Sequence, residues 1–276
     1  MQKQAALLAL AASAGLASAQ FTVLVPAASP SDGASFTETY TGTSTIFSTL
    51  SFTGDLTEVN TATWAGEANW DITNNSFGST VSFDPFGTDQ DFTGTVSANV
   101  TASGLFWANN GDQFQFDSFE TFDDGSDGVA DAQWDNASFE FSGGVSATNL
   151  GNLGSNVTFD TNGSGADTEI AVYTLDGILV DTNDDNGGGG LWSLLNLSLA
   201  DGSYLLVVGT FNASFGDGAA IGGAGSGSSV LNVNGNTVAS GQLASGQLDV
   251  YSFTIPAPGS AALLGLGGLA AIRRRR

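Results

Sequence analysis

The sequence predicts an all-β protein built from two antiparallel β-sandwich domains. Aromatic and β-branched residues are frequent, with 19 Phe among 276 residues, whereas the helix formers Lys, Arg and Met are almost absent. That composition favours strands. Short segments also alternate apolar and polar residues between Gly, Asn, Asp and Ser, which is typical of half-buried antiparallel strands. No segment between Gln20 and Pro256 shows a helical repeat of apolar residues.

The first predicted domain covers residues 20–145, where phenylalanines recur two positions apart in short segments. The clearest segments are SFTETY from Ser35, TVSFDPF from Thr80, DQFQFDSF from Asp112 and ASFEFSG from Ala137. Because side chains alternate between the two faces of a strand, these phenylalanines are expected to share a core. Four tryptophans are expected to pack beside them: Trp64, Trp70, Trp107 and Trp134.

The second predicted domain covers residues 146–255 and follows a seam, rich in Gly and Asn, between Gly143 and Asn156. Turn dipeptides at Asp176-Gly177 and Asp201-Gly202 separate its predicted strands. The stretch YLLVVG from Tyr204 is apolar on both faces, as expected for the central strand of a sheet.

This second half resembles the bacterial pre-peptidase C-terminal domain. The matching residues are Asp167-Thr168-Glu169-Ile170, the turn at Asp176-Gly177, the pair Asp184-Asp185, and Gly202-Ser203-Tyr204 before the apolar strand. Domains of that family are jelly-roll-like β-sandwiches appended to many secreted proteins. The resemblance therefore implies a jelly-roll-like fold and an exported location, and it implies no reaction.

The N-terminus, residues 1–19, has the layout of a secretory signal peptide. Lys3 precedes an apolar run from Ala5 to Leu16, and Ala17-Ser18-Ala19 forms the small-residue motif that signal peptidase recognises. Cleavage is expected between Ala19 and Gln20, so signal peptidase is a predicted partner and the mature chain begins at Gln20.

The C-terminus, residues 256–276, orders three features: Pro256-Ala257-Pro258, an apolar segment from Gly259 to Ile272, and an arginine cluster. The cluster comprises Arg273, Arg274, Arg275 and Arg276. This order resembles a PEP-CTERM sorting signal, with Ala257 where that family usually has glutamate. The resemblance implies an apolar membrane helix that an exosortase-type enzyme removes. Its alternative is a permanent membrane anchor, and in either case the body contacts the membrane only through this segment.

The body between these ends is strongly acidic. All five basic residues lie outside it and all 28 acidic residues lie inside, so its net charge moves from −23 to −28. Such a body repels nucleic acid and anionic lipid, so neither is an expected partner. Its carboxylates need water, backbone amides or bound cations as partners. Cysteine is absent, so no disulfide stabilises the fold.

Missing residue types exclude most catalytic chemistry. Without His or Cys the chain cannot form a Ser-His-Asp triad, a Cys-His pair or the common zinc sites, and without Lys the body has no Schiff base or P-loop. Carboxylate chemistry remains, and a glycoside hydrolase acting through two carboxylates stays open as an alternative. The six glutamates are Glu38, Glu58, Glu67, Glu120, Glu140 and Glu169. Most lie in alternating strands on the expected solvent face, so we predict no catalytic residue and no enzymatic activity.

Two acidic loops are candidate calcium sites, because calcium prefers clustered carboxylate and carbonyl oxygens. The first supplies Asp181, Asn183, Asp184 and Asp185, and Asp160 and Asp167 join it if their strands are neighbours. The second supplies Asp123, Asp124, Asp127 and Asp131, in a pattern that departs from an EF-hand. The alternative is that these side chains only cap turns. A calcium ion at either loop is expected to be structural.

Together these features predict an exported, non-enzymatic protein of the cell surface or extracellular matrix, with a structural or adhesive role. Multivalent cations could bridge its acidic surface to an anionic extracellular polysaccharide. The alternative binding function is a glycan-binding module that stacks sugars on exposed aromatic side chains.

Overall fold

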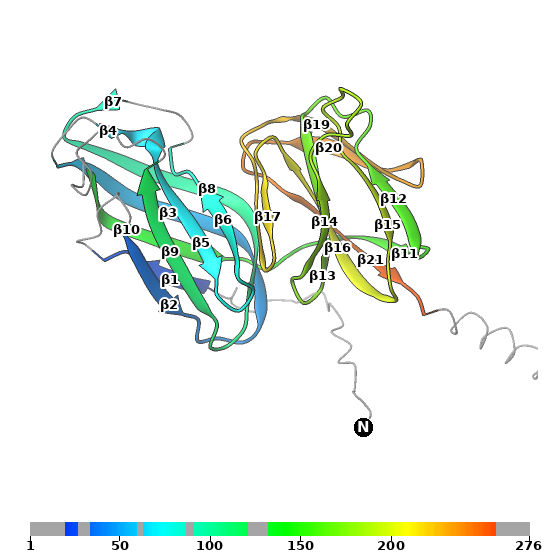
Figure 1. Ribbon diagram of the computed structural model, residues 1–276, viewed down its shortest axis with the longest axis horizontal. Coiled ribbons are helices and arrows are strands. Elements are labelled where there is room, and N and C mark those ends of the chain that lie inside the picture. The colour runs from blue at the N-terminus through cyan, green and yellow to red at the C-terminus, as the bar shows by residue number, and fades with distance from the viewer. Residues whose placement is uncertain (1–19, 27–33, 60–62, 87–90, 121–131, 258–276) are drawn as a thin grey trace, which may run out of the picture.

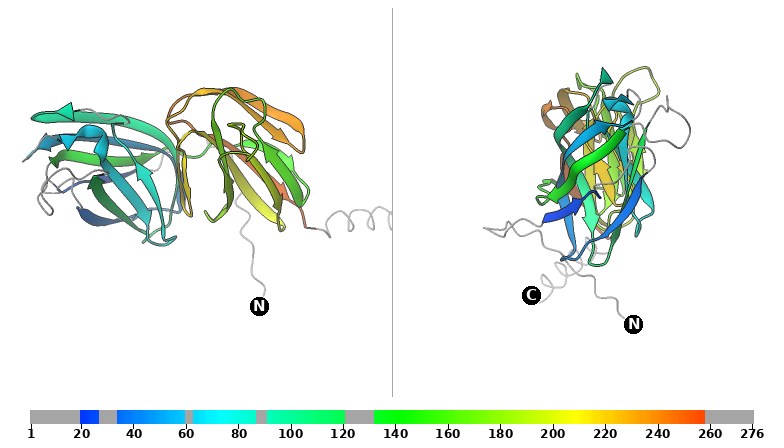
Figure 2. Two further views of the ribbon diagram at one scale, coloured as in Figure 1. Left: turned by 45° about the horizontal axis from the view of Figure 1, so that its top comes forward. Right: turned by 90° about the vertical axis from the view of Figure 1, so that its left-hand side faces the viewer.

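The computed structural model describes residues 20–26, 34–59, 63–86, 91–120 and 132–257. Within these ranges the protein is all-β, as predicted, and the single helical turn is the 3-10 helix η1 (Ala65–Glu67). Four sheets of four or more strands are arranged as two stacked pairs that lie side by side (Figures 1 and 2). A two-stranded ribbon, β4 (Thr63–Trp64) with β7 (Asp91–Phe92), lies at the end of the first pair.

The first pair combines a six-stranded with a four-stranded sheet. The larger sheet has the order β1 (Gln20–Leu24), β10 (Ala132–Ser142), β3 (Thr45–Glu58), β8 (Thr95–Ala108), β18 (Ala219–Ile221) and β17 (Ser214–Gly216). The smaller has the order β2 (Ser35–Thr39), β9 (Gln113–Glu120), β5 (Ala68–Asn74) and β6 (Ser79–Phe83). Every pairing is antiparallel.

The core of the first pair is aromatic, as the alternating phenylalanines predicted. Phe52 lies with its ring centroid 4.8 Å from Phe139 and 5.1 Å from Trp134. Trp70 is fully buried and meets Phe139 edge to face at 5.3 Å. Edge-to-face contacts of this kind add to the free energy gained by burying the rings.

The second pair combines a five-stranded with a four-stranded sheet. The larger sheet has the order β11 (Thr148–Asn152), β21 (Asp249–Ile255), β16 (Gly202–Thr210), β13 (Thr168–Thr174) and β14 (Leu179–Asn183). The smaller has the order β15 (Leu194–Ser198), β12 (Asn156–Asp160), β19 (Gly227–Val233) and β20 (Asn236–Leu243). β11 runs parallel to β21, so this sheet is mixed rather than wholly antiparallel as expected. No hairpin joins these two strands, so nothing forces them to run in opposite directions.

β16 is the central strand of its sheet, as its apolar sequence predicted, and it is buried on both faces. Leu206 and Val208 pack in the core between the two sheets. Leu205 and Val207 face the other way and pack against Leu105 of β8, which belongs to the first pair. The two pairs of sheets therefore share an apolar interface.

The hairpin β17–β18 joins the two pairs directly. Although it lies late in the chain, β18 pairs with β8, Ala220 opposite Leu105, and so extends the six-stranded sheet. The Tyr173 hydroxyl of β13 donates a hydrogen bond to the Ala219 carbonyl at 3.0 Å. The Trp107 indole N–H of β8 donates to the Leu175 carbonyl at 2.9 Å. Hydrogen bonds thus cross the interface in both directions.

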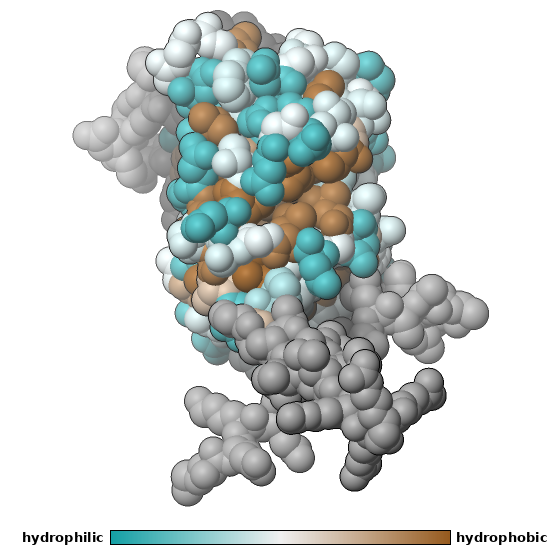
Figure 3. Space-filling model, turned by 90° about the vertical axis from the view of Figure 1, so that its right-hand side faces the viewer, coloured by the Kyte–Doolittle hydropathy of each residue, from teal (hydrophilic) through white to brown (hydrophobic). Residues whose placement is uncertain are grey.

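Figure 3 looks onto the far end of the second pair, where apolar side chains form a band framed by hydrophilic ones.

Pro256 follows β21 as exposed, irregular chain. The predicted signal peptide, with Ala19, and the sorting-signal residues Pro258 and Arg273 to Arg276 lie outside the described residues. Among the described residues, no helix has the length and apolarity needed to cross a membrane.

Candidate metal centre

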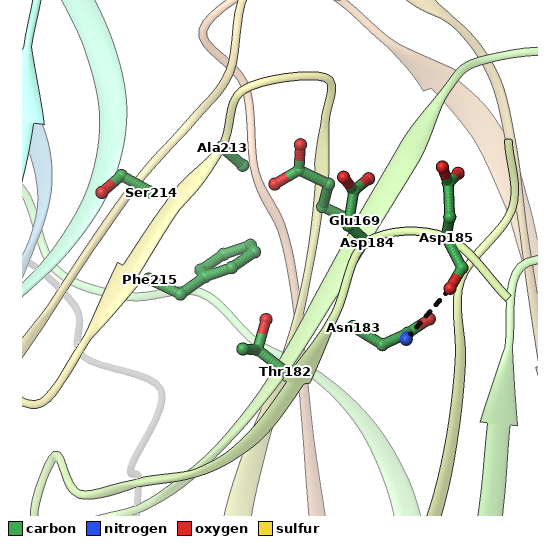
Figure 4. A pocket seen from close by; sticks show the side chains of 8 residues that line it. All are labelled: Glu169, Thr182, Asn183, Asp184, Asp185, Ala213, Ser214 and Phe215. Carbon is green, nitrogen blue, oxygen red and sulfur yellow. Dashed lines mark hydrogen bonds between the residues drawn. The ribbon is translucent and has the colours of Figure 1, made fainter. Parts of the chain in front are cut away.

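An open pocket lies where the hairpin β17–β18 leaves the second pair of sheets (Figure 4). Its volume is about 580 Å³. Its walls come from β13, from the end of β14 with the loop that follows it, and from the start of β17. The lining residues are Glu169, Thr182, Asn183, Asp184, Asp185, Ala213, Ser214 and Phe215.

Three carboxylates meet beside this pocket and form what we call the acidic triad: Asp167, Asp184 and Asp185. One oxygen of each lies within 4.8 Å of the others. Asp167 directly precedes β13 and the other two directly follow β14. Because β13 and β14 are antiparallel neighbours, the start of one and the end of the other meet at the same edge of the sheet. The triad could therefore hold a metal ion.

Asp167 is the partly buried member of the triad. Its Oδ1 is inaccessible to solvent and has no hydrogen-bond partner among the described residues. Buried polar atoms are almost always paired with protein, water or an ion. Oδ1 therefore lacks the partner that buried polar atoms normally have, in a residue that lies beside two further carboxylates.

Backbone and side-chain contacts hold the loop that carries the other two carboxylates. The Ser193 hydroxyl donates to the Asp184 carbonyl at 2.5 Å. The Asn183 side chain accepts from the Leu194 N–H at 2.7 Å and donates to the Asp185 carbonyl at 3.2 Å. These bonds orient the loop, and they leave the triad carboxylates free for a ligand.

Burial and mutual repulsion set the electrostatics of the triad. Burial first, and then the charges of Asp184 and Asp185, raise the pKa of Asp167. Burial and Asp185 likewise raise the pKa of Asp184. Since the body contains no Lys, Arg or His, no side chain can neutralise this charge. Protonation or a bound cation can do so, and the cation leaves the carboxylates ionised at neutral pH.

Glu169 lies on β13 two residues after Asp167 and connects the triad to the hairpin. It is only 8% exposed. Its Oε1 accepts a hydrogen bond from the Asn212 backbone N–H at 2.7 Å, just before β17. Burial, followed by the charge of Asp184, raises the pKa of Glu169 to about 7. In the sequence Glu169 stands apart from the acidic loops, so it was not among the predicted metal ligands.

The structure separates the predicted ligands of the first loop. It brings Asp184 and Asp185 together with Asp167, whereas Asp181 lies outside the triad and accepts a hydrogen bond from the neighbouring Thr182 N–H. Asn183 is engaged by backbone groups at both ends of its amide. Asp160 also lies outside the triad, and its Oδ1 accepts a hydrogen bond from the Asn232 side chain at 2.7 Å. The carboxylate that completes the cluster, Asp167, directly precedes β13, the strand paired with β14.

The second predicted loop, with Asp123, Asp124, Asp127 and Asp131, lies outside the described residues, so its calcium site stays a prediction.

Burial also bears on the two alternative functions. Glu169 is the only buried residue among the six glutamates. Trp70, Trp107 and Trp134 are at most 4% exposed, so none of them can stack on a sugar. The glycan-binding alternative would need other aromatic side chains.

Comparison with protein-family models, with curated proteins and with solved structures gives no match for this chain. The function must therefore be argued from the site and from the chemistry of the sequence.

Proposed function

We propose that this protein is an exported, non-enzymatic component of the cell surface or extracellular matrix that is stabilised by calcium. The observation that carries the proposal is the acidic triad, three carboxylates gathered beside one pocket in a body without a single basic side chain. Repulsion among these carboxylates lowers the stability of the fold where hairpin β17–β18 leaves the second pair of sheets. A divalent cation bound there removes the repulsion and ties β13 to the end of β14.

Calcium fits the triad better than zinc or copper. Carboxylate and carbonyl oxygens are hard ligands, and calcium accepts them in irregular arrangements with six to eight partners. Asp167, Asp184 and Asp185 supply the carboxylates, and the open pocket leaves room for water ligands. Zinc and copper prefer nitrogen or sulfur ligands, which a chain without His or Cys does not have.

The motifs at the two ends of the chain support the proposed export and sorting, and the fold is compatible with their removal. β1 begins at Gln20, the residue after the predicted signal-peptidase site. β21 ends at Ile255, immediately before the proline motif. Both predicted cleavages would thus leave every described strand intact. The second pair of sheets would then be the jelly-roll-like module that its resemblance to the pre-peptidase C-terminal domain implies.

Mapping the terminal peptides of the protein recovered from its native cells tests export and sorting. The expected mature chain begins at Gln20 and ends near the Pro256 motif, without the arginine cluster. A chain that keeps Arg273 to Arg276 would show that the apolar segment stays as an anchor. A chain that keeps Lys3 would contradict export through a cleaved signal peptide.

Binding to an anionic polysaccharide tests the adhesive role. The purified body, residues 20–257, is expected to be retained on an alginate column in calcium and released by a chelator, because calcium bridges carboxylates on both partners. Retention on a neutral glucan without calcium would instead favour the glycan-binding module. Binding to neither polymer would contradict a polysaccharide partner.

A further inference from the structure

The predicted mature N-terminus lies at the start of an edge strand, with its side chain exposed. Gln20 is the first residue of β1, the edge strand of the six-stranded sheet, and it pairs with Ser142 of β10. Its side chain is exposed and has no hydrogen-bond partner among the described residues. Its carboxamide is therefore free to turn toward its own backbone nitrogen.

The neighbouring residue holds this end of the chain in place. The Phe21 ring lies 5.6 Å from Phe141 and 5.4 Å from Tyr40, centroid to centroid, in the aromatic core. This anchor fixes β1 at its first residues, so a change at Gln20 itself leaves the strand pairing in place.

Removal of the signal peptide also makes the amino group of Gln20 unique. The only lysine of the chain, Lys3, leaves with the signal peptide, and the body contains neither His nor Arg. The α-amino group is then the single primary amine of the mature protein and the single basic group of its body. The inference below rests on the proposed cleavage after Ala19.

We propose that Gln20 is converted to pyroglutamate after signal-peptide cleavage. The α-amino nitrogen attacks the side-chain Cδ and forms a five-membered lactam, while the bond from Cδ to the amide nitrogen breaks. That nitrogen leaves with the proton lost by the amine, as ammonia. No oxidant or second substrate is needed. An α-amino group has a pKa of about 7.7 to 8, so the uncharged nucleophile is present near neutral pH.

The surroundings of Gln20 permit this ring closure. It occurs within one residue and needs no movement of β10, and the lactam keeps one N–H. The residue across the strand is Ser142, a hydroxyl that forms no ion pair with the amine. No described strand covers the outer edge of β1, so a cyclase could also reach the end of the chain.

The conversion removes the last positive charge from the body and blocks its N-terminus. A modification that caps the α-amino group removes the charge of that terminus. Here the body becomes entirely anionic, which favours cation-mediated over direct contacts with anionic polymers. Its N-terminus also becomes closed to aminopeptidases that need a free α-amine.

Mass spectrometry of the N-terminal peptide from native cells tests the proposal. The expected peptide begins at residue 20 and is lighter than its unmodified sequence by one ammonia. A peptide that begins at Gln20 with a free amine would overturn the modification and leave the cleavage site intact. A peptide that begins elsewhere would overturn both the cleavage site and the modification.

Amine labelling of the whole protein at the moment of harvest supplies the matched control. The native protein is expected to take up no amine-reactive label, because neither terminus nor side chains carry a primary amine. Gln20→Asn is expected to take up one label per chain, since its shorter amide cannot close a five-membered lactam. One label on the native protein as well would contradict the proposal.

Discussion

Asp112 and Asp167 show what a carboxylate needs in a body without basic residues. Asp112 is buried in the turn between β8 and β9 and accepts hydrogen bonds from the Ser76 hydroxyl at 2.7 Å, the Asn109 N–H at 2.8 Å and the Asn74 amide at 3.2 Å. Burial by itself raises the pKa of Asp112, but these donors outweigh it and lower the pKa overall. Asp167 has one oxygen without any donor. Asp112 therefore stabilises the fold through hydrogen bonds, whereas Asp167 is suited to binding a cation.

Replacing Asp112 tests this stabilising role through the pH dependence of the free energy of unfolding. A carboxylate with a lowered folded pKa stabilises the protein fully above its unfolded pKa of about 3.9, and this stability is lost as the pH falls through the folded pKa. Asp112→Asn is expected to cost about 2 kcal/mol at pH 7 and to flatten the loss of stability in acid. Denaturant unfolding from pH 3 to 7 measures both. Asp201→Asn, at an exposed turn, is the control. If the unfolding free energy of both variants changes equally with pH, Asp112 does not have this stabilising role.

Part of the metal centre was predictable from the sequence. Carboxylates as dense as Asp184-Asp185 in a glycine-rich loop indicate a cation site, and Asp167 was expected to join it if its strand lay nearby. Register decided the rest, because only the pairing of β13 with β14 brings Asp167 to these carboxylates and carries Asp181 away from them. Sequence spacing alone does not specify that pairing.

The hairpin β17–β18 is the element that sequence patterns did not reveal. Its strands have three residues each, too few to show an alternating pattern. A signal does exist on the partner strand, where β8 alternates up to Ser103 and then turns continuously apolar from Leu105 to Ala108. Such a switch indicates a strand that becomes buried on both faces. Here the second face is covered by the other pair of sheets.

Placing a charge in this interface tests the role of the hairpin. Ala220 is fully buried between β8 and the second pair of sheets, so Ala220→Glu is expected to destabilise the protein by on the order of 3 kcal/mol. It should also expose the hairpin to protease. Val238→Glu makes a similar change at an exposed position of β20 and should alter stability by less than about 0.5 kcal/mol. Equal effects of the two substitutions in thermal unfolding would argue against an interface held by the hairpin.

Over the whole molecule, the all-β class was predictable, because it depends on local alternation of apolar and polar residues. The mixed sheet and the joined pairs of sheets were not, because both depend on pairings between residues about 100 positions apart, such as Thr148 with Tyr251 and Leu105 with Ala220. The two pairs of sheets are consequently joined by strand pairing and by an apolar interface.

Expressing the first half alone tests whether it depends on the interface with the second pair of sheets. Residues 20–145 lack the hairpin, so the edge of β8 from Gly104 to Phe106 loses its partner strand, and Leu105 and Trp107 lose the apolar residues that cover them. Exposed edges and apolar side chains promote self-association. The fragment is expected to oligomerise in size-exclusion chromatography, whereas residues 20–257 should not do so through this edge. A monomeric, stable fragment would contradict a shared interface.

Calcium titration of residues 20–257 by isothermal calorimetry tests the central claim most directly, with Asp184→Asn and Asp181→Asn as paired variants. Asp184→Asn removes a triad carboxylate without loss of the fold, because neutralising that side chain relieves repulsion. The predicted result is that one saturable calcium site of the native body is retained in Asp181→Asn and lost in Asp184→Asn, whereas any binding by the loop with Asp123 and Asp124 is the same in all three proteins. Identical isotherms for all three proteins, or no saturable binding in the native body, would contradict a calcium site at the acidic triad.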